Sequence, residues 1–287
     1  MIVTVLGAAR LGELVGLPAD DETGLLRLVE AERGSSHVLV LTPSYGLVAA
    51  REQAHVLVAA HRETKVCVLP LDHHALTLTL IAYDLLSGTG TDGDPSQVLL
   101  QVRRSADTSR SLLWYPRLWG LTQPSPSLRQ SLADAVRRTG WFQELDGRGE
   151  VVSGRTNPPF EATDTVHHLS GAPALLVEQL GGARALEVPL EVERAPYWAR
   201  STVELTVLRP APRPQELLRP CRDCGAGLLD GLCPFCGHGP VTVREASAPA
   251  GYLAAVATAT TPEPVIDHRP LAPVGAAGTT LARGENP

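Results

Sequence analysis

The sequence has little of what marks a nucleic-acid-binding or membrane protein. Its formal net charge is -6, and aromatic residues make up 4% of its 287 residues. A mildly acidic chain has no overall field that draws it to nucleic acid or to an anionic membrane surface, although a local basic patch remains compatible with this composition. The single lysine among 25 basic residues indicates the codon usage of a GC-rich, bacterial genome.

Long apolar runs are also missing. A membrane-spanning helix needs about 18 or more uninterrupted apolar residues. The strongest candidate, residues 66–83, contains Asp72, His73 and His74. Residues 1–7 lack the basic region that begins a signal peptide, and we expect a strand there instead. The sequence therefore predicts neither membrane insertion nor a secretion signal.

Four of the five cysteines stand in metal-ligand spacing. Cys221 and Cys224 form one Cys-x-x-Cys pair, Cys233 and Cys236 form a second, and a glycine follows each pair. This spacing places four thiolates within reach of one tetrahedral centre, which predicts a structural Zn²⁺ site. Four protein ligands leave the metal no open position for a substrate. Because thiolates persist in a reducing compartment, we expect a cytoplasmic protein.

The cysteine segment, Cys-x-x-Cys-Gly with Cys-Pro-x-Cys-Gly, resembles the zinc ribbon family over residues 219–240. The resemblance implies a small binding or docking module. The formal charges of the segment cancel, which does not favour phosphate contact. We expect contact with another protein instead, through the apolar residues Leu228, Leu229, Leu232 and Phe235.

The first 87 residues alternate between short β-branched runs and helix-period patterns. The runs at residues 2–7, 37–42 and 65–70 suit strands that helices cover on both sides. A helix is expected over residues 75–86. The sequence therefore predicts an α/β fold, with a mainly parallel sheet of three or more strands in residues 1–87.

Residues 97–208 predict a second, α+β part, which either stands alone or packs with the first part as one body. Strands are expected at residues 98–102, 150–153, 186–192 and 203–207, and helices at residues 127–138 and 173–180. Pro189 predicts that the third of these strands lies at a sheet edge, where it would pair with the fourth.

The rest of the chain is predicted to be a linker, a module and a tail. Residues 209–219 form a Pro-rich linker whose first six residues, Arg-Pro-Ala-Pro-Arg-Pro, predict a stiff spacer between the body and the zinc module at residues 220–241. Residues 245–287 contain few large apolar side chains and predict a disordered tail. On this arrangement, chelation would unfold residues 219–240 and leave the body folded.

Polar side chains follow two of the predicted strands. Ser44 follows one, and Asp72, His73 and His74 follow the next. The carboxyl ends of parallel strands converge at the edge where such sheets bind ligands, so these residues form an alternative ligand site and the basis of an enzyme alternative. No phosphate loop or nucleophile motif surrounds them, and Asp72 is expected to be a helix N-cap.

Residues 99–142 form a basic stretch that contains seven arginines and only two aspartates. Arginines interleaved with aromatic rings are typical of proteins that hold single-stranded nucleic acid. The candidate contacts are Arg103, Arg104, Arg110, Trp114, Arg117 and Trp119. Because large side chains are scarce here, burial in the core is favoured over nucleic-acid contact.

The sequence has one well-defined metal site and lacks a complete set of catalytic residues. These two features favour a binding function over catalysis. The sequence predicts a non-enzymatic adaptor or assembly component of a bacterial cytoplasm, which makes protein–protein contacts and carries Zn²⁺ as a structural ion. The enzyme and the nucleic-acid-associated protein remain the two alternatives.

Overall fold

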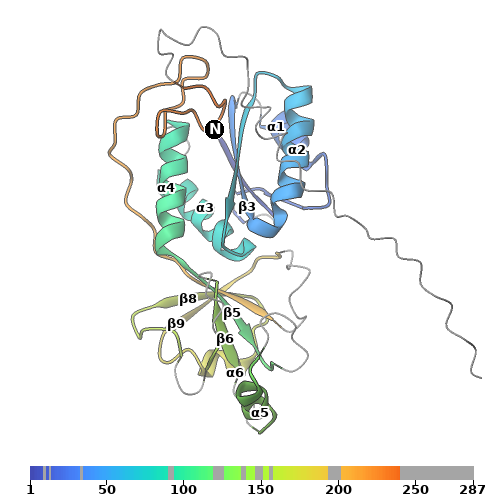
Figure 1. Ribbon diagram of the computed structural model, residues 1–287, viewed down its shortest axis with the longest axis vertical. Coiled ribbons are helices and arrows are strands. Elements are labelled where there is room, and N and C mark those ends of the chain that lie inside the picture. Colours follow the sequence, from blue (N-terminus) through green and yellow to red (C-terminus); the bar gives the residue numbers. More distant parts are fainter. Residues whose placement is uncertain are drawn as a thin grey trace, which may run out of the picture. The chain divides into compact units, whose positions relative to one another are not determined.

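The computed structural model describes residues 1–8, 11–12, 14–32, 35–89, 94–118, 126–136, 140–145, 151–154, 158–192 and 202–239. These residues form two sheets with their covering helices (Figure 1). The tail predicted at residues 245–287 lies outside the described residues. In the described part of the chain, no helix is both long and apolar enough to cross a membrane.

The first sheet is parallel throughout and has the strand order β2-β1-β3-β4. Its strands are β1 (Ile2–Leu6), β2 (Gly16–Leu17), β3 (His37–Pro43) and β4 (Lys65–Leu71). Every residue of β1 and β3 is buried, as expected of strands with both faces covered. The predicted α/β fold with a parallel N-terminal sheet is confirmed.

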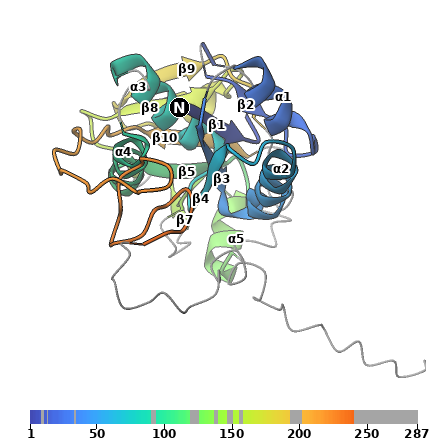
Figure 2. The ribbon, with the colours of Figure 1, turned by 90° about the horizontal axis from the view of Figure 1, so that it is seen from above.

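Helices cover both faces of this sheet (Figure 2). They are α1 (Gly24–Ala31), α2 (Leu47–Ala60), α3 (Ala75–Thr89) and α4 (Pro95–Thr108), and a 3-10 turn, η1 (Ser44–Gly46), leads into α2. Side chains of α1 and α2 share a buried cluster with one face of the sheet. Those of α3 and α4 share a second cluster with the other face.

Helix α4 replaces a predicted strand. Val98, Leu99 and Val102 are buried side by side on one face of the helix, which is the spacing of a helical stripe. The helix starts where Asp94 accepts a hydrogen bond from the Ser96 amide at 2.9 Å, with Pro95 in the first turn. The prediction of a strand at residues 98–102 is therefore wrong, because the Asp94-Pro95 pair starts a helix that runs through these residues.

The second sheet has the order β7-β6-β5-β10-β8-β9 and is antiparallel except for β8 and β9. Its strands are β5 (Arg110–Tyr115), β6 (Trp141–Glu144), β7 (Val151–Ser153), β8 (Thr165–Leu169), β9 (Arg184–Val188) and β10 (Val203–Val207). Two helices, α5 (Leu128–Val136) and α6 (Ala174–Glu178), accompany it. Strand β9 lies at an edge, as predicted, but its expected pairing with β10 is wrong because β8 lies between them.

Residues 209–219 lie along α4 and do not span open solvent. The Ala211 amide donates to the Ser105 hydroxyl at 3.0 Å, and the Thr108 hydroxyl donates to the Arg209 carbonyl at 2.6 Å. Arg104 pairs with Glu216 further along. The segment that follows belongs to the same compact unit as both sheets. The prediction of a spacer that separates the cysteine segment from the body is corrected by these contacts.

Candidate functional site

The four strand-end residues of the first sheet separate into two groups. The Ser44 hydroxyl, in the turn after β3, donates to Asp72 Oδ1 at 2.6 Å, and both side chains are exposed. His73 and His74 turn away from this pair and contact the second sheet. Asp72 is not the N-cap of α3, because His74 Nδ1 accepts the hydrogen bond of the Thr77 amide at 3.2 Å. The predicted ligand site is therefore not assembled as one group.

The His73 ring connects the two sheets. Its Nε2 lies 3.0 Å from the Ala106 carbonyl, so this nitrogen carries the proton and donates. Its Nδ1 then accepts from the Ser111 hydroxyl at 2.7 Å. Burial lowers the pKa of the His73 imidazole, so the ring is neutral near pH 7. Both nitrogens are occupied by structural hydrogen bonds.

His74 is fully buried at the start of α3. Its Nε2 faces the carbonyl oxygens of Leu205 at 2.9 Å and Leu112 at 3.2 Å, so Nε2 is the donor. Burial lowers the pKa of the His74 imidazole to about 4. The Glu204 carboxylate lies beside it, with Oε2 3.4 Å from His74 Nδ1 and 3.3 Å from the Leu76 amide that donates to it.

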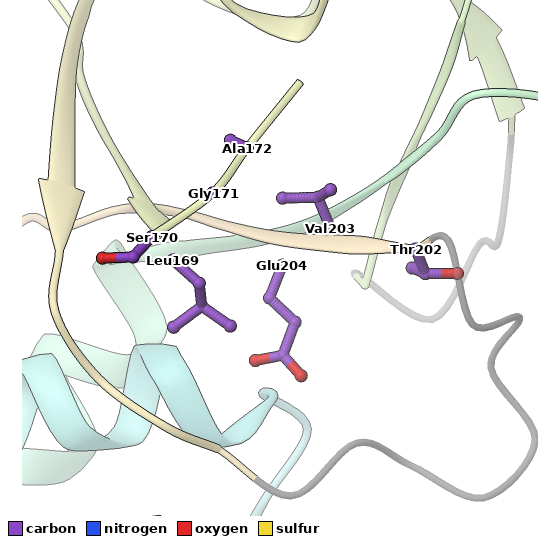
Figure 3. Close-up of a pocket in the computed structure, with 7 residues that line it drawn as sticks. All are labelled: Leu169, Ser170, Gly171, Ala172, Thr202, Val203 and Glu204. Atoms are coloured by element: carbon purple, nitrogen blue, oxygen red, sulfur yellow. The ribbon is translucent and has the colours of Figure 1, made fainter.

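Glu204 also lines a small cavity (Figure 3). The cavity has a volume of about 50 Å³ and is bounded by the end of β8, the turn that follows it, and the start of β10. Its lining residues are Leu169, Ser170, Gly171, Ala172, Thr202, Val203 and Glu204. In Figure 3 the side chains of Leu169 and Glu204 point towards the same helix, whereas Val203 points away from it.

Sequence reasoning missed this cavity. Its two halves are some thirty residues apart and come together because β10 pairs with β8, with Leu205 opposite His168. His167 and His168 both belong to β8, a strand that is absent from the sequence prediction. The alternation of Val166 and His168, both buried, with more exposed neighbours was the available signal of a strand.

The arginine-aromatic stretch does not form a nucleic-acid surface in the described residues. Trp114 is completely buried and donates through Nε1 to Gln179 Oε1 at 3.1 Å. Arg110 makes two hydrogen bonds with Glu144, at 2.5 and 2.7 Å. Arg104 pairs with Glu216. Of the candidate arginines, Arg103 and Arg117 are exposed. Trp119 lies outside the described residues.

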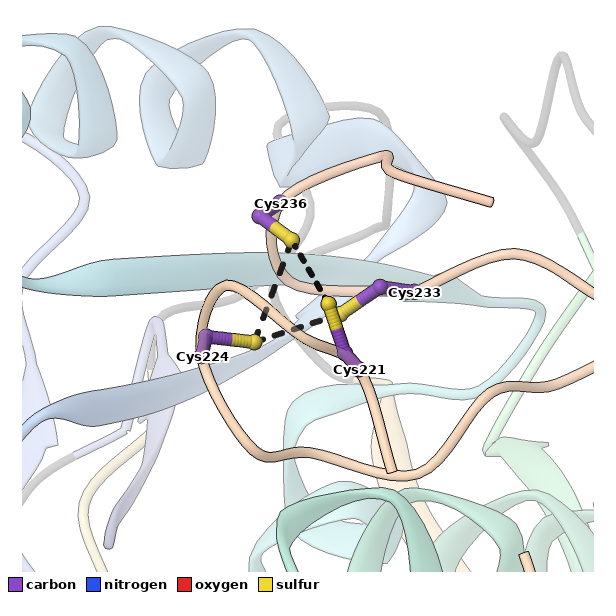
Figure 4. Close-up of side chains that lie close together, drawn as sticks. All are labelled: Cys221, Cys224, Cys233 and Cys236. Atoms are coloured by element: carbon purple, nitrogen blue, oxygen red, sulfur yellow. Dashed lines mark hydrogen bonds between the residues drawn. The ribbon is translucent and has the colours of Figure 1, made fainter. Parts of the chain in front are cut away.

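The four paired cysteines converge in space (Figure 4). All four sulfur atoms lie within 4.8 Å of one another, and the Cys221–Cys236, Cys224–Cys233 and Cys224–Cys236 pairs are 3.5, 3.4 and 3.8 Å apart. All are free thiols. The fifth, Cys67, is buried in β4, where burial raises the pKa of its thiol to about 12.

The apolar side chains expected to meet a partner mostly face the chain itself. Phe235 is buried and its ring packs edge-on against His37, with 5.1 Å between the ring centroids. Leu228 and Leu229 pack against the core shared by the first sheet, α3 and α4. Only Leu232 is largely exposed. The prediction of a protein-binding surface on this segment is corrected, because its apolar groups are used in packing within the chain.

Comparisons with known proteins place the fold. No family model and no curated protein sequence match the chain. A DegV family protein from Corynebacterium glutamicum matches with a TM-score of 0.50 at 12% identity, over 74% of this chain and 98% of that one. A DegV family protein from Eubacterium eligens, loaded with heptadecanoic acid, matches with a TM-score of 0.52 at 12% identity, over 72% of this chain and 99% of that one. At this identity the likeness shows a DegV-like fold.

These findings overturn the functional prediction. The adaptor prediction treats the cysteine segment as the functional part, whereas most of the chain has a fold found in a fatty-acid-loaded protein and the segment packs into it. The enzyme and nucleic-acid alternatives gain no support from these matches or from the geometry of their residues. Assignment of residues 219–240 to the zinc ribbon family is also unsupported, since no family model matches; what the structure shows is a cysteine cluster.

Proposed function

We propose that this chain binds a fatty acid at the junction of its two sheets. The observation that carries the proposal is the match over almost the whole length of a DegV family protein loaded with heptadecanoic acid. The cavity beside Glu204 supports the position, because Glu204 accepts a hydrogen bond from the first turn of α3, which follows the carboxyl end of β4, and open α/β sheets bind ligands at such strand ends. It offers hydroxyl groups from Ser170 and Thr202 and an apolar wall.

The cavity must open for an acyl chain to enter. Sites for ligands of this size have volumes of roughly 300 Å³ or more. The cavity of about 50 Å³ is much smaller. It adjoins a separate apolar cluster of Leu76, Leu80, Val188 and Leu190, and Leu169 contacts both. An acyl chain that replaced these side-chain contacts would lie between α3 and the edge of the second sheet.

The test is to measure fatty-acid binding by the purified full chain. Extraction with organic solvent followed by mass spectrometry should recover bound fatty acid, and the delipidated chain should bind heptadecanoic acid saturably. Ala172→Trp fills the cavity and should weaken binding at least tenfold. Ala174→Trp, at an exposed position two residues later, is the matched control and should bind normally. No extracted fatty acid and no saturable binding would refute the proposal.

The finer interpretation of the cysteine segment, as a zinc-ribbon-like module with a structural role, is also our proposal. Its support is an internal repeat: the Cys221 amide donates to the Ala226 carbonyl at 2.7 Å, and the Cys233 amide donates to the His238 carbonyl at 2.8 Å. Gly225 and Gly237 both adopt positive φ after the second cysteine of each pair. Free thiols in such a module fit a reducing bacterial cytoplasm, the location we propose.

A further inference from the structure

The cysteine cluster has the dimensions of a closed metal site. A tetrahedral Zn²⁺ with four sulfur ligands at about 2.3 Å places neighbouring sulfurs about 3.8 Å apart. Three of the sulfur pairs here lie at 3.4 to 3.8 Å. A disulfide would bring two sulfurs to about 2.05 Å. The spacing therefore fits four thiolates around one ion and does not fit two disulfides.

The backbone is shaped to support thiolates at these positions. Backbone groups of Asp223 and Cys224 lie near the Cys221 sulfur, one of Ala226 lies near the Cys224 sulfur, and one of His238 lies near the Cys236 sulfur, each placed so that it favours the thiolate. Hydrogen bonds from backbone groups orient metal-bound sulfur and offset its charge. Asp230 and Gly231, both at positive φ, close a tight turn between the two pairs and fix their separation.

The same segment is built into the core of the body. Cys221, Ala226, Cys233 and Phe235 share one buried cluster with the first sheet, α3 and α4. Asp94 accepts from the Gly227 amide at 2.9 Å, and the Ser96 hydroxyl donates to the Gly227 carbonyl at 2.6 Å. The residues that begin α4 therefore hold both polar groups of one glycine in the cysteine segment.

We propose that Cys221, Cys224, Cys233 and Cys236 bind one Zn²⁺, and that this ion stabilises the whole body because the segment it organises packs into the core between the first sheet, α3 and α4. A segment of about twenty residues has too little core to keep its shape alone, and its metal supplies the missing free energy. Without the ion, the segment would pack less firmly in that core. This inference does not depend on the fatty-acid proposal.

Metal content is the first measurement. The full chain, purified under reducing conditions, should contain one zinc ion per molecule. Cobalt substitution should give the intense thiolate-to-metal absorption of a tetrahedral sulfur site. Cys221→Ser with Cys236→Ser should remove the ion, whereas Cys67→Ser, which changes the cysteine outside the cluster, should retain it. Iron in place of zinc, clearly less than one ion per chain, or cobalt spectra without thiolate bands would overturn the assignment.

Coupling to the body is the second measurement, made on the wild-type chain so that no variant has to fold. Removing zinc with a chelator should lower the main thermal midpoint by about 5 °C or more and speed hydrogen exchange in β3 and α4. Phe235→Ala should keep one zinc ion but show a smaller midpoint change on chelation. Leu217→Ala, which truncates a fully exposed side chain, is the control and should behave as wild type. Exchange that changes only within residues 219–239 would refute the coupling.

Discussion

The buried imidazole of His74 makes the stability of the body sensitive to acid. This ring is completely buried, and its Nδ1 accepts from the Thr77 amide, so the folded protein resists protonating it. Burial lowers the pKa of His74 from the ordinary value of 6.5 to about 4. The unfolded chain takes up the proton near pH 6.5, whereas the folded chain does so only near pH 4.

The sign and size of the effect follow from these two pKa values. The contribution of His74 to stability is complete above pH 6.5 and is lost as the pH falls from 6.5 to about 4. At about 1.4 kcal/mol for each pH unit, the loss is about 3 kcal/mol at the acid end. This is a large fraction of the stability of an ordinary domain, which is about 5–15 kcal/mol.

Urea unfolding followed by circular dichroism at several pH values between 7.5 and 4.5 measures this directly. His74→Gln keeps a donor and an acceptor but cannot titrate, so its free energy of unfolding should be lower at pH 7.5 and fall less steeply with acid than that of the wild type. His55→Gln, on the exposed face of α2, is the control and should keep the wild-type slope. Burial also lowers the pKa values of His37, His73 and His167. These three histidines are present in all three proteins and contribute equally to the pH dependence of each. Equal slopes for His74→Gln and wild type would refute the reasoning.

Two other predictions concern stability. Asp134→Ala removes the acceptor of the buried Trp141 Nε1 at 2.8 Å and of the Leu118 amide at 3.1 Å. Chemical denaturation should show that the free energy of unfolding falls by about 2–4 kcal/mol. Asp107→Ala, at an exposed position, is the control and should cost about 0.5 kcal/mol or less. Gly46→Ala would place a Cβ 2.6 Å from Thr42 Oγ1 and should cost about 1–3 kcal/mol. Gly88→Ala in α3 meets nothing within 4 Å and should stabilise the protein by about 0.5–1 kcal/mol in the same assay; a loss at Gly88 or no loss at Gly46 would contradict the packing described.

The first sheet could be predicted because its signals are local. Each of β1, β3 and β4 is a mostly apolar run, and such a run is the pattern expected of β1 and β3, which are buried on both faces. The convergence of the four cysteines was readable for the same reason, since metal coordination requires ligands at short, regular spacing. Both features depend on residues that are close in sequence.

The second sheet and the cavity could not be predicted in this way. Strand β10 inserts between β5 and β8, which are about fifty residues apart, and no local pattern encodes that order. Trp114 shows the limit of the sequence: its burial was predicted and is confirmed, but only the strand order shows which core it enters. Phe235 was predicted to contact a partner protein, and this was wrong because its ring packs against His37, which lies far away in the sequence at the start of β3.

The position of α3 links the two proposals. On one side of this helix, Leu78, Ile81 and Leu85 belong to the core that includes the cysteine segment. On another side, Leu76 and Leu80 belong to the cluster beside the cavity. A ligand that enters next to Leu76 must therefore displace contacts on one side of α3 while the other side stays packed. The cysteine segment contributes side chains to the core on that packed side, so it would help to hold α3 in place while the other side opens.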